Sequence, residues 1–162
     1  MNARALLAMT FLLGSCATPD PEAEFTKGTA ALDAGELPTA IAHLEKAVEL
    51  EPGLARNQNN LASAYLAAGR SKDGWPHVRR AVAIDPHDAY AVANCRVFFV
   101  KMRDETHLAN GDPFDQVRKK LGDPDEERNE DGAVSWRYCL ISVQFRDGKL
   151  AGAVDLPFTE KP

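Results

Sequence analysis

The feature that most constrains the fold is an internal repeat in the middle of the chain. Like residues stand 34 positions apart at Gly35 and Gly69, Leu32 and Leu66, Leu44 and Val78, Ala47 and Ala81, Leu50 and Ile84, and Pro52 and Pro86. Glycine permits a tight turn, and proline cannot continue a helix, so each copy predicts two helices joined at the glycine and ended by the proline. Small residues at fixed positions let the paired helices approach closely. A chain with this period is expected to fold as stacked helical hairpins.

This helix–turn–helix period resembles the tetratricopeptide repeat. The matching residues are Gly28, Ala31, Gly35, Ala40, Leu44, Ala47 and Pro52 in the first copy, and Leu61, Ala62, Tyr65, Gly69, Val78, Ala81 and Pro86 in the second. We expect helices near 21–34, 38–50, 54–68, 75–84 and 88–105. The second copy departs from the pattern at Gly74-Trp75-Pro76. Because proline is tolerated best in the first helical turn, the fourth helix is predicted to begin late, near residue 75.

The fifth predicted helix is a cap with an unusually apolar stripe. The stripe consists of Val92, Cys95, Phe99 and Met102, with Phe98 beside it. A helix that ends a repeat stack normally turns a polar face outward. We therefore expect the chain that follows to cover this helix.

From Asn110 onward the pattern changes to one short helix and a small sheet. Asp112 suits a helix N-cap and Pro113 the first helical position, and Gly122 ends the helix. Strands are predicted at 133–138, around 143–145 and over 149–156, with a short one possible at the start of 125–132. Apolar residues switch from even to odd positions after Tyr138, so a bulge or a tight turn is expected near 139–141.

The C-terminal sequence resembles the SmpA/OmlA family, whose fold is BamE-like, over about residues 111–156. The resemblance rests on Leu-Gly-Asp-Pro at 121–124, Trp-Arg-Tyr at 136–138 and Val-Gln-Phe-Arg-Asp-Gly-Lys-Leu at 143–150. It implies an outer-membrane lipoprotein that assists β-barrel assembly. The predicted fold class is α+β, with two hairpin repeats and a cap helix at 22–105 followed by a helix-plus-antiparallel-sheet unit at 111–156.

The first residues are typical of a secretory signal peptide. Arg4 precedes an apolar run from Ala5 to Leu13, and Leu13-Gly14-Ser15-Cys16 resembles the lipobox of bacterial lipoproteins. The resemblance implies a signal peptide at 1–15, a diacylglyceryl group on Cys16 and a short tether at 16–21. Ala17 after the cysteine implies sorting to the outer membrane, with the lipid in its inner leaflet and the protein on the periplasmic face. An ordinary secretory signal is the alternative.

Charge and motifs argue against nucleic acid and against catalysis. The net charge is −5 and the pI about 5.4, whereas nucleic-acid binders carry a basic face. The sequence contains no GxSxG, P-loop, GxGxxG or HExxH motif, and its four histidines lack metal-like spacing. The acidic residues from Asp123 to Asp131 lack the spacing of an EF-hand. We therefore predict no enzyme activity, no cofactor and no metal.

The expected binding surface is the face of the first helix of each repeat, which lines a peptide groove in the tetratricopeptide family. The matching residues are Phe25, Thr29, Asp33, Arg56, Asn59, Ser63, Leu66, Tyr90 and Val97. Asn59 is predicted to bond to a peptide backbone and Arg56 to a carboxylate. The predicted function is an interaction adaptor or assembly factor in outer-membrane or secretion biogenesis, with a protein or peptide partner. The alternative is a regulator that acts on a periplasmic enzyme through the C-terminal sheet.

Two cysteines remain beside Cys16. Cys95 lies on the apolar stripe of the cap helix, and Cys139 lies where the sheet changes phase. Because both would stand in an oxidising compartment, one possibility is a disulfide bond between them. The other is a pair of separate buried thiols, and only the distance between their Cα atoms decides between the two.

Overall fold

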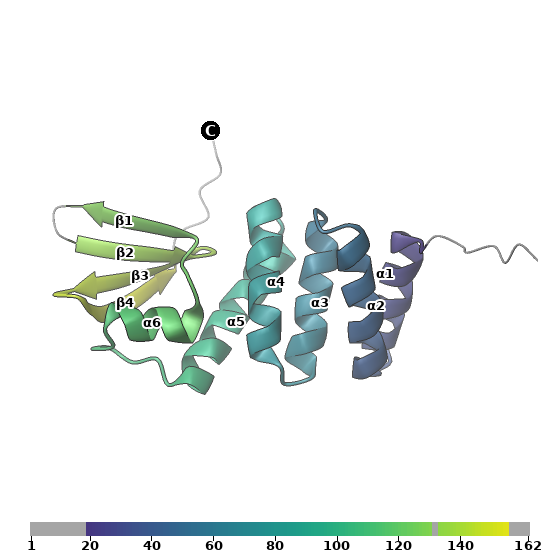
Figure 1. The fold of residues 1–162 in the computed structure, drawn as a ribbon, viewed down its shortest axis with the longest axis horizontal. Helices are drawn as coiled ribbons and strands as arrows, with labels where there is room; N and C mark the ends of the chain where they lie inside the picture. The colour runs from purple at the N-terminus through teal and green to yellow at the C-terminus, as the bar shows by residue number, and fades with distance from the viewer. Residues whose placement is uncertain (1–18, 131–132, 156–162) are drawn as a thin grey trace, which may run out of the picture.

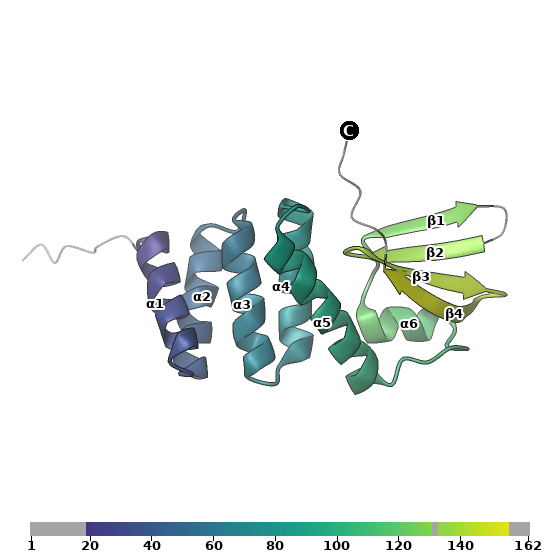
Figure 2. The ribbon, with the colours of Figure 1, turned by 180° about the vertical axis from the view of Figure 1, so that it is seen from behind.

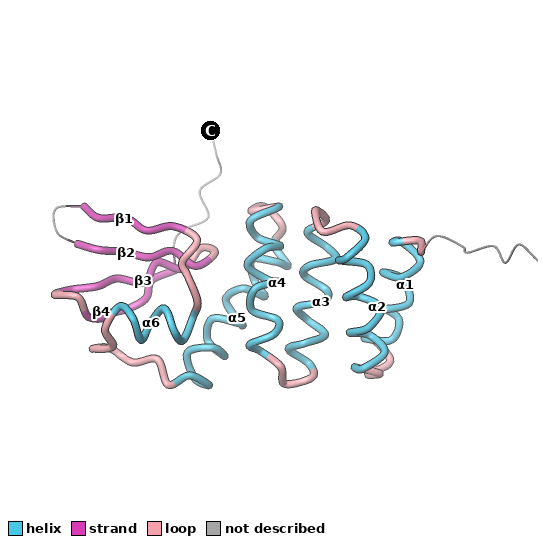
Figure 3. The backbone as a smooth tube through the Cα atoms, in the orientation of Figure 1, coloured by secondary structure: helices cyan, strands magenta, loops and turns pink. Residues whose placement is uncertain are grey.

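The computed structural model describes residues 19–130 and 133–155. Within them, a stack of five helices is followed by a short sixth helix and a four-stranded antiparallel sheet (Figure 1, Figure 3). The elements are α1 (Pro21–Asp33), α2 (Leu37–Leu50), α3 (Ala55–Ala67), α4 (Ser71–Ile84), α5 (Ala89–Thr106), α6 (Phe114–Leu121), β1 (Glu126–Glu130), β2 (Ala133–Tyr138), β3 (Ile141–Arg146) and β4 (Lys149–Asp155). The predicted α+β class is confirmed, with the helical hairpins at one end of an elongated molecule and the sheet at the other.

The turns of the two hairpins contain equivalent backbone hydrogen bonds. After α1, the Glu36 N–H donates to the Ala31 carbonyl at 2.8 Å, and at the equivalent position after α3 the Arg70 N–H donates to the Tyr65 carbonyl at 2.8 Å. The glycine in each turn has a positive φ, 76° in the first and 71° in the second. A side chain is strained in this left-handed region, which explains why glycine recurs there.

Helix α4 begins at Ser71, four residues earlier than predicted, and it contains Pro76 in its interior. Its first residue stands exactly one repeat period after the first residue of α2, so the repeat register overrides the local preference of proline. Gly74 lies in the first turns of this helix, at a close crossing with its neighbours. A Cβ atom there would lie 2.7 Å from the Phe98 ring and 3.1 Å from the Ala62 carbonyl oxygen. The missing side chain lets α4 approach both α3 and α5.

The strands lie in the order β1-β2-β3-β4, and each is antiparallel to its neighbour. Tyr138 pairs with Ile141, so a two-residue turn at Cys139 and Leu140 joins β2 to β3, with Cys139 at a φ of 52°. This tight turn moves the inward-facing residues from even to odd positions, as one of the two predicted alternatives requires. The edge strand β1 is made of charged and polar residues, which disfavour pairing with another chain.

One hydrophobic core crosses from the repeats into the sheet, so the expected cover of the cap helix is present. Its buried members come from α3, α4, α5, α6, β2, β3, β4 and the β2–β3 turn. They are Ala62, Trp75, Val78, Ala81, Val82, Ala91, Val92, Cys95, Phe98, Phe99, Met102, Val117, Leu121, Trp136, Tyr138, Cys139, Ile141, Val143, Phe145 and Leu150. A second, smaller core joins α1, α2 and α3.

The predicted signal peptide at 1–15 and Cys16 lie outside the described residues. Of the predicted tether at 16–21, residues 19–21 are described, and the last of them, Pro21, is already the first residue of α1. Among the described helices, none has the length and apolar character that crossing a bilayer requires.

Candidate functional site

The first helices of the repeats, α1, α3 and α5, form one face of the helical stack (Figure 2). We call it the first-helix face. Its residues are Glu22, Phe25, Thr29 and Asp33 on α1, Arg56, Asn59, Ser63 and Leu66 on α3, and Tyr90, Asn94, Val97 and Val100 on α5. Glu22, Arg56 and Tyr90 share one repeat position, and Thr29, Ser63 and Val97 share another. The structure therefore brings all nine predicted groove residues onto neighbouring helices, although their environments differ.

Arg56 is already paired with a carboxylate of its own chain. Its guanidinium contacts Glu22, which occupies the same repeat position in α1, and it also lies over the Phe25 ring at 4.7 Å. Both partners of the ion pair remain about half exposed, so water screens the pair and its contribution to stability is small. A partner's carboxylate would have to share Arg56 with Glu22.

Asn59 is buried, with 7% of its surface exposed, which corrects the prediction that it is free to bond a peptide backbone. The Asn94 side chain donates one hydrogen bond to the Asn59 side-chain oxygen at 2.9 Å and another to the Ser63 hydroxyl at 3.1 Å. The physical reason is that α3 and α5 pack closely enough to exclude a ligand at this level. Asn94 was not predicted, because its repeat equivalent Asn60 is not a groove residue and the register therefore gives no signal for it.

The α5 end of the first-helix face is apolar and exposed. Tyr90 is 80% exposed, Val97 47% and Val100 45%. The three side chains follow the spacing of one helical stripe, and Ala93 lies between them. Helix α5 is thus apolar on two sides, one buried in the core and one in solvent. Val100 was not predicted, although it completes a repeat series with two leucines.

The other predicted residues serve the fold as much as the surface. The Thr29 hydroxyl donates to backbone carbonyls of its own helix at 3.0 Å, a common role of threonine inside a helix. Phe25 and Leu66 are half-buried and pack against the two cores, and Asp33 is exposed at the end of α1.

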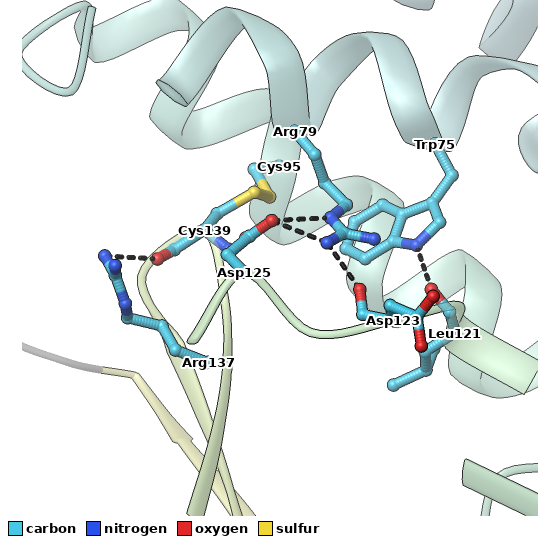
Figure 4. The surroundings of a disulfide bond; sticks show 8 residues. All are labelled: Trp75, Arg79, Cys95, Leu121, Asp123, Asp125, Arg137 and Cys139. Atoms are coloured by element: carbon cyan, nitrogen blue, oxygen red, sulfur yellow. Dashed lines mark hydrogen bonds and ion pairs between the residues drawn. A yellow bond between two sulfur atoms is a disulfide. The ribbon is translucent and has the colours of Figure 1, made fainter. Parts of the chain in front are cut away.

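A dense seam joins the repeats to the C-terminal unit (Figure 4). Cys95 of α5 and Cys139 of the β2–β3 turn form a disulfide bond, with Cα atoms 6.7 Å apart. Asp125 accepts the Cys139 backbone N–H at 2.6 Å and the Arg79 guanidinium Nε–H at 3.1 Å. One carboxylate therefore links α4 to the turn that carries the disulfide.

Two further hydrogen bonds of the seam end on the last carbonyls of α6. The Trp75 indole Nε1–H donates to the Leu121 carbonyl at 2.7 Å, and the Tyr138 hydroxyl donates to the Gly122 carbonyl at 2.8 Å. Burial raises the pKa of Tyr138, which favours the protonated hydroxyl that donates this hydrogen bond.

In the described ranges, no group of three or more histidine, cysteine, aspartate or glutamate side chains is placed to hold a metal ion. The acidic residues after Asp123 pair instead with arginines. Asp123 contacts Arg118, and Asp125 contacts Arg79. The partly buried His77 lies 2.8 Å from the Gln58 side-chain oxygen, and burial lowers the pKa of this histidine.

Solved structures of two tetratricopeptide (TPR) domains are similar to this chain. The OM64 TPR domain of Arabidopsis is 20% identical, with a TM-score of 0.47 over 62% of this chain and 79% of that one. The Sgt2 TPR domain from Aspergillus fumigatus is 20% identical, with a TM-score of 0.48 over 65% of this chain and 68% of that one. No family model and no curated protein matches the sequence. Helices α1–α5 are hairpin repeats by the 34-residue period of their sequence and by the packing of each helix on the next.

Proposed function

We propose that this protein is a non-catalytic interaction module that holds a protein partner on the α5 end of its first-helix face. The observation that carries the proposal is the second apolar stripe of α5, with Tyr90, Val97 and Val100 in solvent. Scattered apolar residues are normal on a surface, but a contiguous stripe is typical of a contact site. Tyrosine is also among the residues that contribute most binding energy at interfaces.

The chemistry of the stripe favours an amphipathic helix as the segment that docks. From Tyr90 to Val100 the stripe is about 15 Å long at ~1.5 Å per residue, which matches three turns of a partner helix. A polar group borders it on one side, because Arg56 lies on the neighbouring helix α3, where it is paired with Glu22 of α1. Such an arrangement, with an apolar centre and a polar rim, is that of a specific protein interface.

Site-specific crosslinking tests the proposal. A photoreactive amino acid at Val97 is expected to capture a partner in the source cell, and the same group at the exposed Leu54 serves as the control. The captured protein is then purified, and its affinity for Tyr90→Ala is expected to be at least tenfold weaker than for the parent chain. Equal affinity for parent and Tyr90→Ala would exclude this face as the site.

We further propose that the module is a lipoprotein of the outer membrane, facing the periplasm, and that it acts in envelope biogenesis. The Leu13-Gly14-Ser15-Cys16 sequence supports this proposal. The Cys95–Cys139 disulfide supports export, since such bonds persist in oxidising compartments. Mass spectrometry of the mature N-terminus is expected to show an acylated Cys16, and Cys16→Ser is expected to lose membrane attachment. An unacylated terminus at another residue would contradict the lipid anchor.

The crosslinking experiment also separates the proposal from regulation of a periplasmic enzyme through the sheet. Gln144 is exposed on β3, on the face of the sheet that points away from α6. Capture of a hydrolase from Gln144, with none from Val97, would favour the regulator.

A further inference from the structure

A cleft of about 950 Å³ lies where α4, α5 and α6 meet, on the seam between the repeats and the C-terminal unit. We call it the junction cleft. It is lined mainly by Lys72, Trp75 and Arg79 of α4, Met102 of α5, and Lys119 and Leu121 of α6. Because its walls come from both halves of the chain, the cleft exists only in the packed molecule. Its volume is in the range of sites that hold small molecules or short peptide segments.

The charge of the junction cleft is opposite to that of the whole protein. The chain carries a net charge of −5, yet the cleft is lined by four cationic side chains and one carboxylate, that of Asp115. Two of these cations already form ion pairs within the protein, Arg79 with Asp125 and Lys120 with Asp112. Low-dielectric walls focus the field of such a cluster and attract ligands of the opposite sign.

Two of the cations are available to a ligand. Over residues 19–130 and 133–155, neither Lys72 nor Lys119 has a hydrogen-bond or ion-pair partner, and both are exposed at the rim. They belong to different elements, α4 and α6, and both line the same hollow, so one anionic group held in that hollow can meet both. This arrangement favours an acidic segment that inserts into the cleft over the flat surface of a bilayer.

The backbone carbonyls at the C-terminal end of α6 repel an anion less than those of a free helix C-terminus would. Exposed carbonyls at such an end carry partial negative charge. Here the Leu121 carbonyl accepts from Trp75 and the Gly122 carbonyl accepts from Tyr138. The negative ends of these dipoles are thus covered by donors of the protein itself.

The floor of the junction cleft is apolar. Trp75, Met102 and Leu121 are each at most 4% exposed, and Pro76 lies at the rim. A ligand that fits both floor and rim carries an apolar group next to carboxylates. We infer that the junction cleft binds an acidic peptide segment with an apolar residue, and that it is a second docking site distinct from the first-helix face.

Two indole groups provide a local test by nuclear magnetic resonance. The Trp75 indole N–H lies at the cleft floor, whereas Trp136 lies in the aromatic cluster under β2 and serves as an internal control. The probe is a hexapeptide of alternating glutamate and leucine, titrated into the ¹⁵N-labelled protein. We expect the Trp75 indole signal to shift saturably while the Trp136 signal stays in place. A peptide with glutamine instead of glutamate is expected to bind at least tenfold more weakly.

Matched charge reversals complete the test. Lys72→Glu with Lys119→Glu is expected to weaken hexapeptide binding at least tenfold, and Lys101→Glu with Lys149→Glu, two exposed lysines outside the cleft, less than twofold. Equal weakening by both pairs would show a net-charge effect and overturn the site, as would an unmoved Trp75 signal. Cosedimentation with phosphatidylglycerol vesicles covers the other anion source. Vesicle binding that depends on Lys72 and Lys119, without peptide binding, would overturn the peptide assignment.

Discussion

Reduction of the Cys95–Cys139 disulfide is expected to lower the stability of the whole molecule without separating its halves. The bond closes a loop with a sequence separation of 44 residues. In the chain-entropy description, removing a crosslink of that span frees the unfolded chain and lowers the free energy of unfolding by about 4 kcal/mol at most. The folded state keeps its other seam contacts, including the Trp75–Leu121 and Tyr138–Gly122 hydrogen bonds.

Urea unfolding with and without dithiothreitol measures the effect. With a slope of ~2 kcal/mol per molar urea, a loss of about 4 kcal/mol moves the midpoint down by about 2 M. Far-UV circular dichroism follows mainly the helices, and tryptophan fluorescence follows Trp75 in α4 and Trp136 in β2. Because one core spans both halves, the two signals are expected to coincide in both redox states.

The control is the Cys95→Ala, Cys139→Ala double variant, whose midpoint dithiothreitol is expected to leave unchanged. A shift below about 0.5 M in the parent protein would refute the assignment of substantial stability to the disulfide. Two separated transitions after reduction would refute the shared core instead.

Two further changes have defined outcomes. Gly74→Ala places a Cβ 2.7 Å from the Phe98 ring and is expected to lower the free energy of unfolding by about 1–3 kcal/mol, whereas Gly53→Ala, which meets open space, should change it by less than ~0.5 kcal/mol in the same urea assay. Burial and the hydrogen bond to Glu45 raise the pKa of Tyr65 from 10.0 to about 12, so unfolded chains lose this proton first and stability falls from pH 10 to 12. Urea midpoints at pH 9, 10 and 11 are expected to fall less steeply in Tyr65→Phe, and an identical slope would contradict the shift.

The repeat elements were predictable because their determinants are local. The glycines of the two turns and the prolines after α2 and α4 act within a few residues, so the helix ends agree with the sequence to within about two residues except at the start of α4. At that helix start the prediction was wrong, because it relied on the preference of proline for the first helical turn. Gly74 lies inside the helix, where α4 passes close to Phe98, a residue 24 positions away, and no local pattern expresses that contact.

The candidate site was only half predictable for the same reason. Repeat register assigned nine residues to the first-helix face, but register does not reveal which of them bond to each other. Asn59 is buried because Asn94 reaches it from α5, 35 residues away. The role of Asp125 likewise depends on Arg79, which lies 46 residues earlier and meets it only through the packing of two different units. Asp125 of the acidic loop thus links α4 to the turn between β2 and β3.

The hairpin stack ends at α5, because the buried stripe of this helix packs against the C-terminal unit and Cys95 is bonded to Cys139. The sheet and α6 therefore cover the side of α5 on which a further helix would have to pack. Gene duplication can therefore add repeats before α3 but not after α5. A whole repeat unit inserted between α2 and α3 preserves every contact of the seam, whereas one added after α5 would displace the sheet and separate Cys95 from Cys139.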